Sequence, residues 1–415
     1  MQDIDQLALA VLNTPQVDAA RRDLEELYAA DKSAQWPLTR QRISAAVGEY
    51  AFAAAQSAAS DPARPMLNWR NAYARRHAGL NVPSGRFGTD NPDNAYMFIG
   101  MSGEYSYRID GQLADHPPCI FTYSLLDGDY VRTSHIKTQG LLGKNDLVVD
   151  ADGRFTITID ASPADGRPNH IQSTPDTVML NLRETLADWT IELPAKLSIS
   201  RTDGKATPPA HSVEDMAVRA ASYIREGAPF WALKFHHESY EKIAPNQPQP
   251  IMSSAKRLGG LLTQFSSHGS FTLEEDEAYV VRVDPFDADY VGFQLADAWM
   301  VSADYVDRLG SLNNRQVVAD ADGRISYVIS RSDPGAHNWL DAGGMDMGGT
   351  TIRFQGMKDI DRDFSGAFEV WHGKIADLRS VLPAETTWVD AADRAEQIRK
   401  RVDSYRRRER ALLGE

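Results

Sequence analysis

The chain has 415 residues, of which 42% are hydrophobic and 25% are charged. This is the composition of a globular protein with room for two or three domains. Its formal net charge of −14 opposes nonspecific attraction to nucleic acid or to anionic lipid, so neither is expected as a partner.

The first residues, MQDIDQLALAVLNTPQ, are acidic where a secretory signal is basic, and the chain has no run of about 18 apolar residues that could cross a membrane. A single cysteine, Cys119, excludes disulfide bonds within the chain. We therefore expect a cytoplasmic protein that does not contact membranes.

Helices are expected at the N-terminus. Thr14 followed by Pro15 is a favourable helix start, and the alanine-rich segment TRQRISAAVGEYAFAAAQSAAS predicts a second helix before the helix-breaking sequence DPARP. From about residue 95 the sequence becomes aromatic and β-branched, and it alternates with period two in YMFIGMSGEYSYRIDG and RFTITID. The chain is therefore expected to enter a β-sheet there.

A helical connector and a linker are expected before a second β-rich stretch. Ser212 and Asp215 have the spacing of a capping box at a helix start, and Gly227 with Pro229 should end that helix. The segment PNQPQP (245–250) cannot supply the donors of a regular β ladder and is expected to be a linker.

The C-terminal sequence DAADRAEQIRKRVDSYRRRERALLGE predicts a final helix. Its apolar stripe consists of Ile398, Val402, Tyr405 and Leu412. The arginines between these positions are expected to form a solvated face rather than an RNA site.

The chain contains an internal duplication. VVDADGRFTITID (148–160) aligns with VVADADGRISYVIS (317–330), and in each copy Asp-Gly predicts a tight hairpin turn before a strand with alternate residues facing the core. The alignment continues downstream and pairs Asn169 with Asn338, His170 with Trp339, Gln172 with Asp341, and Arg183 with Arg353.

Two related β modules favour a pair of packed sandwiches over a solenoid or a propeller. The expected segments are a helical N-terminal region (1–88), a first β-sandwich module (89–205), a helical connector with a proline-rich linker (206–265), a second β-sandwich module (266–385) and a C-terminal helix (386–415).

The segment DADGRISYVISRSDPGAHNWLDAGGMDMGGTTIRF (320–354) resembles the domain of unknown function family 1214. That family has a strand ending in Asp-Gly, an alternating strand, a loop with Asn-Trp-Leu, then glycines and a strand with an arginine. A looser resemblance covers 277–356, and the first module is similar to a diverged copy. The chain departs from the family in lacking the partner domain numbered 1254 and in having DAGG after Trp-Leu instead of Pro-Ala-Pro.

The resemblance implies jelly-roll-like β-sandwiches and implies no particular reaction. The expected fold is therefore α+β and mainly β, with two jelly-roll-like antiparallel β-sandwich modules, a helical N-terminal region, a helical connector and a C-terminal helix.

The loop PGAHNWLDAGG (334–344) has two interpretations, of which the structural one is favoured. In it, Asn338 caps a turn, Trp339 fills the open end of the sandwich and Arg353 pairs with a carboxylate. Because Asn169 and Arg183 repeat the asparagine and the arginine in the first module, these four residues are expected to be structural.

The functional interpretation places a catalytic site in the same loop. His337 and Asp341 have no identical counterparts in the first module, and a histidine oriented by a carboxylate is a typical general base. Trp339 would then stack on a ring of the substrate. His170, the counterpart of Trp339, is a further expected substrate-binding residue.

Other candidate residues have weaker support. In NPDNAY, Asp93 and Tyr96 suit either a turn or a hydroxyl-binding rim, and we include them among the expected substrate-binding residues. His135 and His372 are isolated histidines, which are more often structural than catalytic.

The segment KFHHES (234–239) would place His236 and Glu238 on one face if it were a strand, but a zinc site needs a third ligand and none has a recognisable spacing. No metal is therefore expected. No nucleotide-binding glycine loop, nucleophile elbow or HExxH helix is present, so no cofactor is expected either.

The leading hypothesis is a cofactor-free enzyme of small-molecule catabolism. Acid-base chemistry of lyase or hydrolase type is expected, on a hydroxylated, ring-containing compound such as a sugar, a phenolic or a terpenoid. The alternative is a noncatalytic ligand-binding protein or a homo-oligomeric assembly protein. An enzyme should have a closed pocket lined by His337 or Asp341, whereas an assembly protein should bury these loops between subunits.

Overall fold

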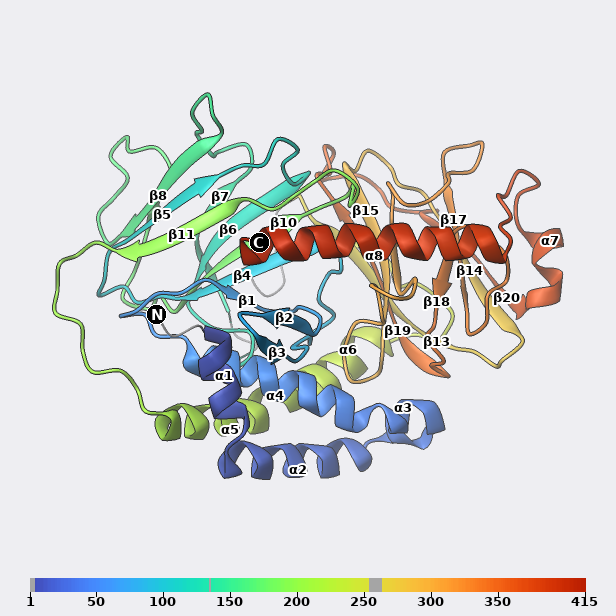
Figure 1. The fold of residues 1–415 in the computed structure, drawn as a ribbon. Helices are drawn as coiled ribbons and strands as arrows, with labels where there is room; N and C mark the ends of the chain where they lie inside the picture. The colour runs from blue at the N-terminus through green and yellow to red at the C-terminus, as the bar shows by residue number, and fades with distance from the viewer. Residues whose placement is uncertain (1–3, 134–135, 254–262) are drawn as a thin grey trace.

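The computed structural model describes residues 4–133, 136–253 and 263–415. It contains two β-sandwiches side by side, a layer of helices along one side of them and a long C-terminal helix that crosses both (Figure 1). The expected fold class is confirmed. No helix within the described ranges is long and apolar enough to cross a membrane. His135 lies outside the described residues.

The first sandwich consists of a five-stranded and a four-stranded sheet. The five-stranded sheet has the order β1 (Asn68–Trp69), β4 (Asn94–Gly100), β10 (Met179–Thr185), β6 (Ile120–Leu126) and β7 (Thr138–Gly143). The four-stranded sheet has the order β11 (Lys196–Arg201), β5 (Tyr107–Gln112), β8 (Arg154–Asp160) and β9 (His170–Gln172). Side chains from both sheets, including Ile99, Ile109 and Ile157, form one buried core.

The second sandwich has the same composition. Its five-stranded sheet has the order β12 (Met252–Ser253), β13 (Phe265–Thr272), β19 (Met347–Gln355), β15 (Tyr290–Ala296) and β16 (Ser311–Asn313). Its four-stranded sheet has the order β18 (Trp339–Asp341), β17 (Ile325–Ser330), β14 (Glu277–Val283) and β20 (Phe368–Lys374).

The two sandwiches share one topology, as the internal duplication predicts. Every strand of the first has a counterpart at the same place in the second, and in each the pair β8/β9 or β17/β18 is parallel while the other pairs are antiparallel. The alternating strands bury the predicted faces, because Ile157 and Ile159 in β8, and Tyr327 and Ile329 in β17, are fully buried.

Each Asp-Gly forms a tight turn, but not a hairpin between neighbouring strands. The amide of Gly153 donates to Asp150 at 3.0 Å, and that of Gly323 donates to Asp320 at 2.9 Å. Both glycines have the positive φ that such a turn requires, +72° and +86°. The prediction of a hairpin is wrong because β7 and β16 lie in one sheet of each sandwich whereas β8 and β17 lie in the other.

The N-terminal region is helical only as far as Ala59. Its helices are α1 (Ile4–Leu12), α2 (Pro15–Ala29), the short 3-10 helix η1 (Lys32–Gln35), α3 (Pro37–Gln41) and α4 (Ile43–Ala59). The small strands β1, β2 (Arg75–His77) and β3 (Leu80–Val82) follow, and β1 pairs with β4. The first sandwich therefore begins inside the segment that was expected to be helical, because such short strands carry no periodic pattern.

Helix α2 begins at Pro15 as predicted, but Thr14 does not cap it through its side chain. The Thr14 hydroxyl donates instead to the Val11 carbonyl at 2.7 Å. The capping box of α5 (Val213–Pro229) is present, because the Ser212 side chain accepts from the Asp215 amide and the Asp215 carboxylate accepts from the Ser212 amide.

The α-helix of the connector ends at Pro229, as Gly227 and Pro229 predict, but the chain does not leave the helical conformation there. It continues through a π-helical turn, η2 (Phe230–Phe235), into α6 (His236–Tyr240). Gly227 allows the helix to pack closely against the segment that contains Val131, because a Cβ at this position would lie 2.1 Å from the Val131 carbonyl oxygen. The segment KFHHES is therefore helical and not a strand.

The segment 245–250 is attached to the second sandwich along much of its length. The amide of Asn246 donates to Ser270 at 2.8 Å, and the amide of Gln249 donates to His268 at 2.9 Å. Both acceptors lie on β13, so these prolines alternate with residues that do contribute hydrogen bonds at the sheet edge.

The C-terminal helix α8 (Ala391–Leu413) crosses both sandwiches (Figure 1). Arg394, Arg401 and Arg408 lie at intervals of seven along it and are only 5%, 6% and 5% exposed. The prediction of a solvated arginine face is therefore wrong for these three. A short helix, α7 (Leu378–Val381), precedes α8.

Candidate functional site

Asn338 and Asn169 form the same backbone clamp in the two sandwiches. The Asn338 side chain accepts from the Val318 amide at 2.9 Å and donates to the Val318 carbonyl at 2.7 Å. Asn169 makes the same two bonds with Val148, at 2.8 and 2.7 Å. Each clamp fixes the segment before the Asp-Gly turn to the start of β9 or β18.

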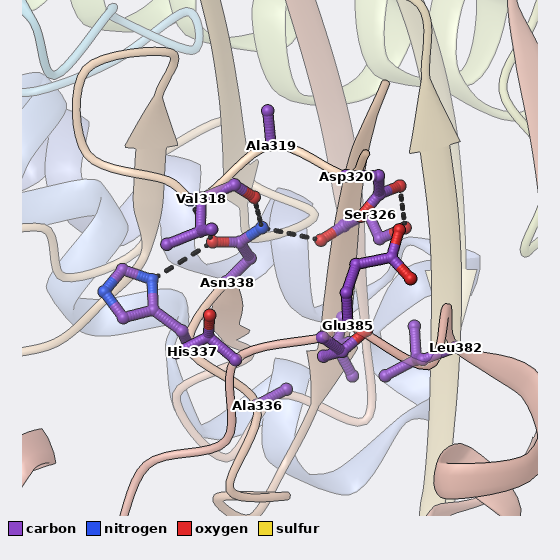
Figure 2. Close-up of a pocket in the computed structure, with 12 residues that line it drawn as sticks. Val318, Ala319, Asp320, Ser326, Ala336, His337, Asn338, Leu382 and Glu385 are labelled. Carbon is purple, nitrogen blue, oxygen red and sulfur yellow. Dashed lines mark hydrogen bonds between the residues drawn. The ribbon is translucent and has the colours of Figure 1, made fainter. Parts of the chain in front are cut away.

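His337 lies at a pocket that is too small for a substrate. Its Nδ1 is 3.1 Å from the Asn338 Oδ1, and the Asn338 amide donates to Val318 and Ser326 (Figure 2). The pocket has a volume of about 20 Å³ and is lined also by Leu382 and Glu385. A cavity of this size holds about one water molecule.

Trp339 belongs to the core of the second sandwich. Its side chain is 6% exposed, and its indole Nε1 donates to the Ser330 carbonyl at 3.3 Å. The guanidinium of Arg394 from α8 lies over the ring, 5.1 Å from its centroid. Because both the ring face and the indole nitrogen have partners, this position corresponds to the structural interpretation of the loop.

Asp341 does not join His337 at the pocket. Its carboxylate accepts from Arg308 at 2.7 Å and from the Gly343 amide at 2.8 Å, and it is 5% exposed. It is absent from the pocket lining that contains His337. The expected pair of base and orienting carboxylate is therefore not assembled, because Arg308 and the Gly343 amide occupy the carboxylate while His337 Nδ1 contacts Asn338.

Arg353 joins the second sandwich to the segment before β4. Its guanidinium donates to the Thr89 carbonyl at 2.6 Å and contacts the Gln294 side chain. Its counterpart Arg183 lies beside the hydroxyl of Tyr130 within the first module. Within the described part of the chain, Arg353 therefore does not form the predicted ion pair with a carboxylate.

Asp93 lies in a buried network between the two sandwiches. It is 1% exposed and accepts from Trp189 at 2.7 Å, from the Tyr290 hydroxyl at 2.6 Å and from Asn313 at 2.8 Å. Burial raises the pKa of Asp93, although these hydrogen bonds favour the charged form. The Tyr96 hydroxyl accepts from the Asn91 amide at 3.0 Å. Neither Asp93 nor Tyr96 therefore lies at an open rim.

His170 is held by the loop that follows β8. Its Nδ1 lies 2.8 Å from the Thr158 hydroxyl and its Nε2 lies 2.8 Å from the Ser162 carbonyl. His372, on β20, lies 3.3 Å from the Glu277 carboxylate. Both histidines therefore have local partners in their own sandwich.

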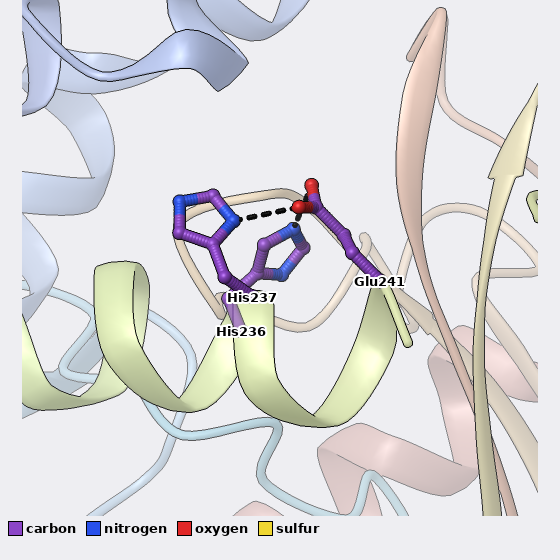
Figure 3. Close-up of side chains that lie close together, drawn as sticks. All are labelled: His236, His237 and Glu241. Carbon is purple, nitrogen blue, oxygen red and sulfur yellow. Dashed lines mark hydrogen bonds and ion pairs between the residues drawn. The ribbon is translucent and has the colours of Figure 1, made fainter. Parts of the chain in front are cut away.

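A cluster of charged side chains lies where α6 meets the N-terminal helices. His237 Nδ1 bonds to Glu241 at 2.8 Å, and His236 Nε2 lies 3.4 Å from the other Glu241 oxygen (Figure 3). The Nε2 of His237 bonds to Asp31 at 3.0 Å. The Lys32 ammonium also contacts Glu241. The ligand atoms of His236, His237 and Glu241 lie within 4.8 Å of one another.

The charges of this cluster favour its ionised form. The bond to Glu241 raises the pKa of His237, against a smaller opposing effect of burial. Burial acts to raise the pKa of Glu241, but contacts with His236, His237 and Lys32 outweigh it and hold that pKa well below its usual range. The same three side chains could hold a metal ion once His237 is deprotonated.

The sequence did not reveal most of this cluster. A strand over 234–239 would have placed His236 and Glu238 on one face, whereas Glu238 is exposed on the helix. A helical interpretation would have placed His237 and Glu241, four residues apart, on one face. The approach of Asp31, which caps the N-terminus of η1, has no signal in the sequence.

An open cavity adjoins the cluster. It has a volume of about 250 Å³, and its lining includes Lys32, Trp36, Glu241, Ser270 and Met347. Trp36 is partly buried. The lining of the cavity therefore combines an indole ring, a hydroxyl group and an ion pair.

Two further cavities meet at Arg219, on α5. The first has a volume of about 340 Å³ and a largely apolar lining that includes Leu7, Met66, Ile199 and Met216. The second, of about 260 Å³, is lined by polar groups that include Arg70, Ser102, Asp129, Arg132 and Thr177. Arg219 lines both.

Arg219 has unused donors at this junction. Its Nε and Nη2 atoms are buried and have no hydrogen-bond partner among the described residues. Arg70 and Asp129 neutralise each other through two bonds, of 3.0 and 2.9 Å, and Arg132 lies over the Tyr223 ring at 5.2 Å. The polar cavity therefore carries excess positive charge in a chain whose formal net charge is −14.

No protein-family model and no curated protein sequence matches this chain. The solved structure of an uncharacterized protein from Burkholderia cenocepacia is similar, with 24% sequence identity and a TM-score of 0.73 over 89% of this chain and 100% of that chain. A Vibrio parahaemolyticus protein of solved structure is 12% identical over 69% of this chain and 90% of that chain, with a TM-score of 0.43. The first likeness supports the fold alone, and the resemblance to the domain of unknown function family 1214 stays a prediction.

Proposed function

We propose that the protein binds a small molecule with an apolar body and an anionic group in the two cavities that meet at Arg219. The observation that carries this proposal is the pair of buried guanidinium nitrogens without hydrogen-bond partners among the described residues. A buried donor without an acceptor costs about 1–3 kcal/mol, and more if it is charged. A carboxylate or phosphate group of a ligand would supply the missing acceptors.

The two cavities suit the two parts of such a ligand. The apolar cavity, with Leu7, Met66 and Met216 in its wall, accommodates a ring or a short aliphatic chain. The polar cavity offers the hydroxyls of Ser102 and Thr177 beside Arg219. A hydroxylated ring compound with a carboxylate or phosphate group therefore fits both the cavities and the substrate class expected from the sequence.

Ligand binding without catalysis is the function that this geometry supports best. His337 and Asp341 do not share a pocket, so they give no support to the acid-base enzyme expected from the sequence. A cofactor-free lyase or hydrolase stays a second candidate because His237 lies between Asp31 and Glu241, and Glu241 lines a separate open cavity. Assembly into a homo-oligomer stays a prediction.

The proposal is tested by thermal unfolding in the presence of benzoate, phenyl phosphate and the uncharged analogue benzyl alcohol. We expect the two anions to raise the melting temperature with increasing concentration, because a ligand that binds only the folded state stabilises it. Benzyl alcohol should have a much smaller effect. Arg219→Gln should weaken anion binding by about 10- to 100-fold, the usual effect of losing a hydrogen bond to a charged group.

Arg225→Gln is the matched control. Arg225 lies on the same helix, but its guanidinium pairs with Asp23 on α2 at 2.8 Å and it lines neither cavity. Its substitution should leave anion binding unchanged. Equal binding of anions by wild type and Arg219→Gln, or equal binding of benzyl alcohol and benzoate, would contradict the proposal.

A further inference from the structure

The cluster on α6 contains three side chains of the types that bind transition metals. Two histidines and one carboxylate are a common ligand set for catalytic zinc, which leaves a fourth position for water or substrate. His236, His237 and Glu241 have their ligand atoms within 4.8 Å of one another. The sequence predicts no metal because it reveals no third ligand, and the helical geometry supplies one in Glu241.

His237 is oriented as a metal ligand would be. Its Nε2 lies 3.0 Å from Asp31, which can accept the Nε2 proton, while its Nδ1 faces Glu241 at 2.8 Å. A carboxylate on the far nitrogen of a ligating histidine fixes the tautomer and the ring orientation. Asp31 therefore leaves the Nδ1 lone pair directed toward the centre of the cluster.

The ring nitrogens of His236 have no hydrogen-bond partner among the described residues. His236 is fully buried and lies parallel to the Tyr240 ring, with centroids 5.7 Å apart. Its Nε2 lies 3.4 Å from Glu241 as an ion-pair contact without hydrogen-bond geometry, and its Nδ1 has no hydrogen-bond partner among the described residues. A buried polar atom without a partner is costly, and a metal ion on Nε2 would remove that cost at one of the two nitrogens.

We propose that His236, His237 and Glu241 bind a divalent transition metal ion, with zinc preferred by the ligand types, and that a fourth coordination position faces the cavity beside Trp36. Glu241 lines that cavity of about 250 Å³, so water or a small substrate can reach the ion. Lys32, whose side chain is 62% exposed, contacts the same carboxylate. The metal ion displaces this ammonium group, which moves freely into solvent.

The site is tested on full-length protein without an affinity tag, by calorimetric titration with Zn²⁺ and by the visible absorption of the Co²⁺ complex. Wild type should bind one equivalent of Zn²⁺, and its Co²⁺ complex should have the intense bands of four-coordinate cobalt. His237→Ala and Glu241→Gln should each weaken Zn²⁺ binding by about 100-fold or more. Asp31→Asn should weaken it by about 10- to 100-fold, the usual effect of losing a group that supports a ligand.

Two controls separate a metal site from a network of ion pairs. Glu238→Gln removes an exposed carboxylate of the same helix and should leave Zn²⁺ affinity unchanged. Lys32→Met removes the cation that competes for Glu241 and should strengthen Zn²⁺ binding. Absence of Zn²⁺ binding to wild type, or equal binding by wild type and the folded His237→Ala and Glu241→Gln variants, would overturn the proposal. This result is independent of the anion binding proposed at Arg219.

Discussion

The two asparagine clamps show how a single side chain can define a loop. Asn169 and Asn338 each satisfy both the amide and the carbonyl of a valine about 20 residues earlier in the chain. They differ in backbone conformation, because Asn169 has a φ of +51° whereas Asn338 has no positive φ. Asparagine tolerates the left-handed region better than other residues with a Cβ.

Replacing either asparagine by alanine should destabilise the fold. We expect Asn338→Ala to lower the free energy of unfolding by about 1–3 kcal/mol, because the valine amide and carbonyl lose their partners. Asn169→Ala should cost about 1 kcal/mol more, because alanine is strained at positive φ. Urea denaturation measures both, with the exposed Asn81→Ala as control. A smaller loss for Asn169→Ala than for Asn338→Ala would show that backbone strain does not contribute.

Helix α8 shows the limit of sequence patterns at the scale of an element. Its length and its N-terminal cap follow from local sequence, and Asp390 with Asp393 forms a capping box. The burial of Arg401 does not, because its Nη2 donates to Ser311 at 2.7 Å and its guanidinium lies 4.4 Å from the Trp189 centroid. Burial lowers the pKa of Arg401 to about 10, so it stays charged at neutral pH.

Arg401→Ala should therefore be strongly destabilising. We expect a loss of about 2–4 kcal/mol, from the broken hydrogen bonds and the lost stacking on Trp189. Arg399→Ala is the matched control, since Arg399 is 60% exposed and pairs with Glu396 and Asp403 on the same helix. Such exposed pairs contribute at most about 1 kcal/mol. Similar melting temperatures for the two variants would show that the contacts of Arg401 on α8 do not stabilise the packing of the two sandwiches.

Errors in predicting other elements have related physical causes. Gly227 and Pro229 are helix-ending residues by local preference, yet the chain stays helical beyond Pro229, and Gly227 lies where a Cβ would clash with Val131 and Tyr50. The segment 245–250 resembles a free linker, yet Asn246 bonds to β13. In both cases the chain makes a contact with a distant segment that the local preference does not reveal.

At the scale of the whole molecule, buried contacts join the two sandwiches and the helical layer. Asp93 of the first module accepts from Tyr290 and Asn313 of the second. Trp299, after β15, stacks on Tyr28 of α2 with ring centroids 4.7 Å apart. These contacts are central and well buried, so the parts should not unfold independently.

We expect the full chain to unfold in one cooperative transition despite its size. Tryptophan fluorescence and far-UV circular dichroism should report the same midpoint in urea. Tyr290→Phe removes one hydrogen bond of Asp93 and should shift both probes together, by the equivalent of about 1–3 kcal/mol. Two separated transitions in wild type would mean that the sandwiches are energetically independent.

Sequence alone determined the helical N-terminal segment, the two β modules with their common topology, the capping box of α5 and the final helix. These features depend on alternation, caps and a repeat, which are properties of neighbouring residues or of two similar segments. Tertiary structure alone decided which polar side chains are buried and which residues share a site. Asp31 meets His237 across 206 positions, and Arg219 lies between two cavities built from several elements. Such meetings depend on how helices and sheets pack, and no local pattern encodes them.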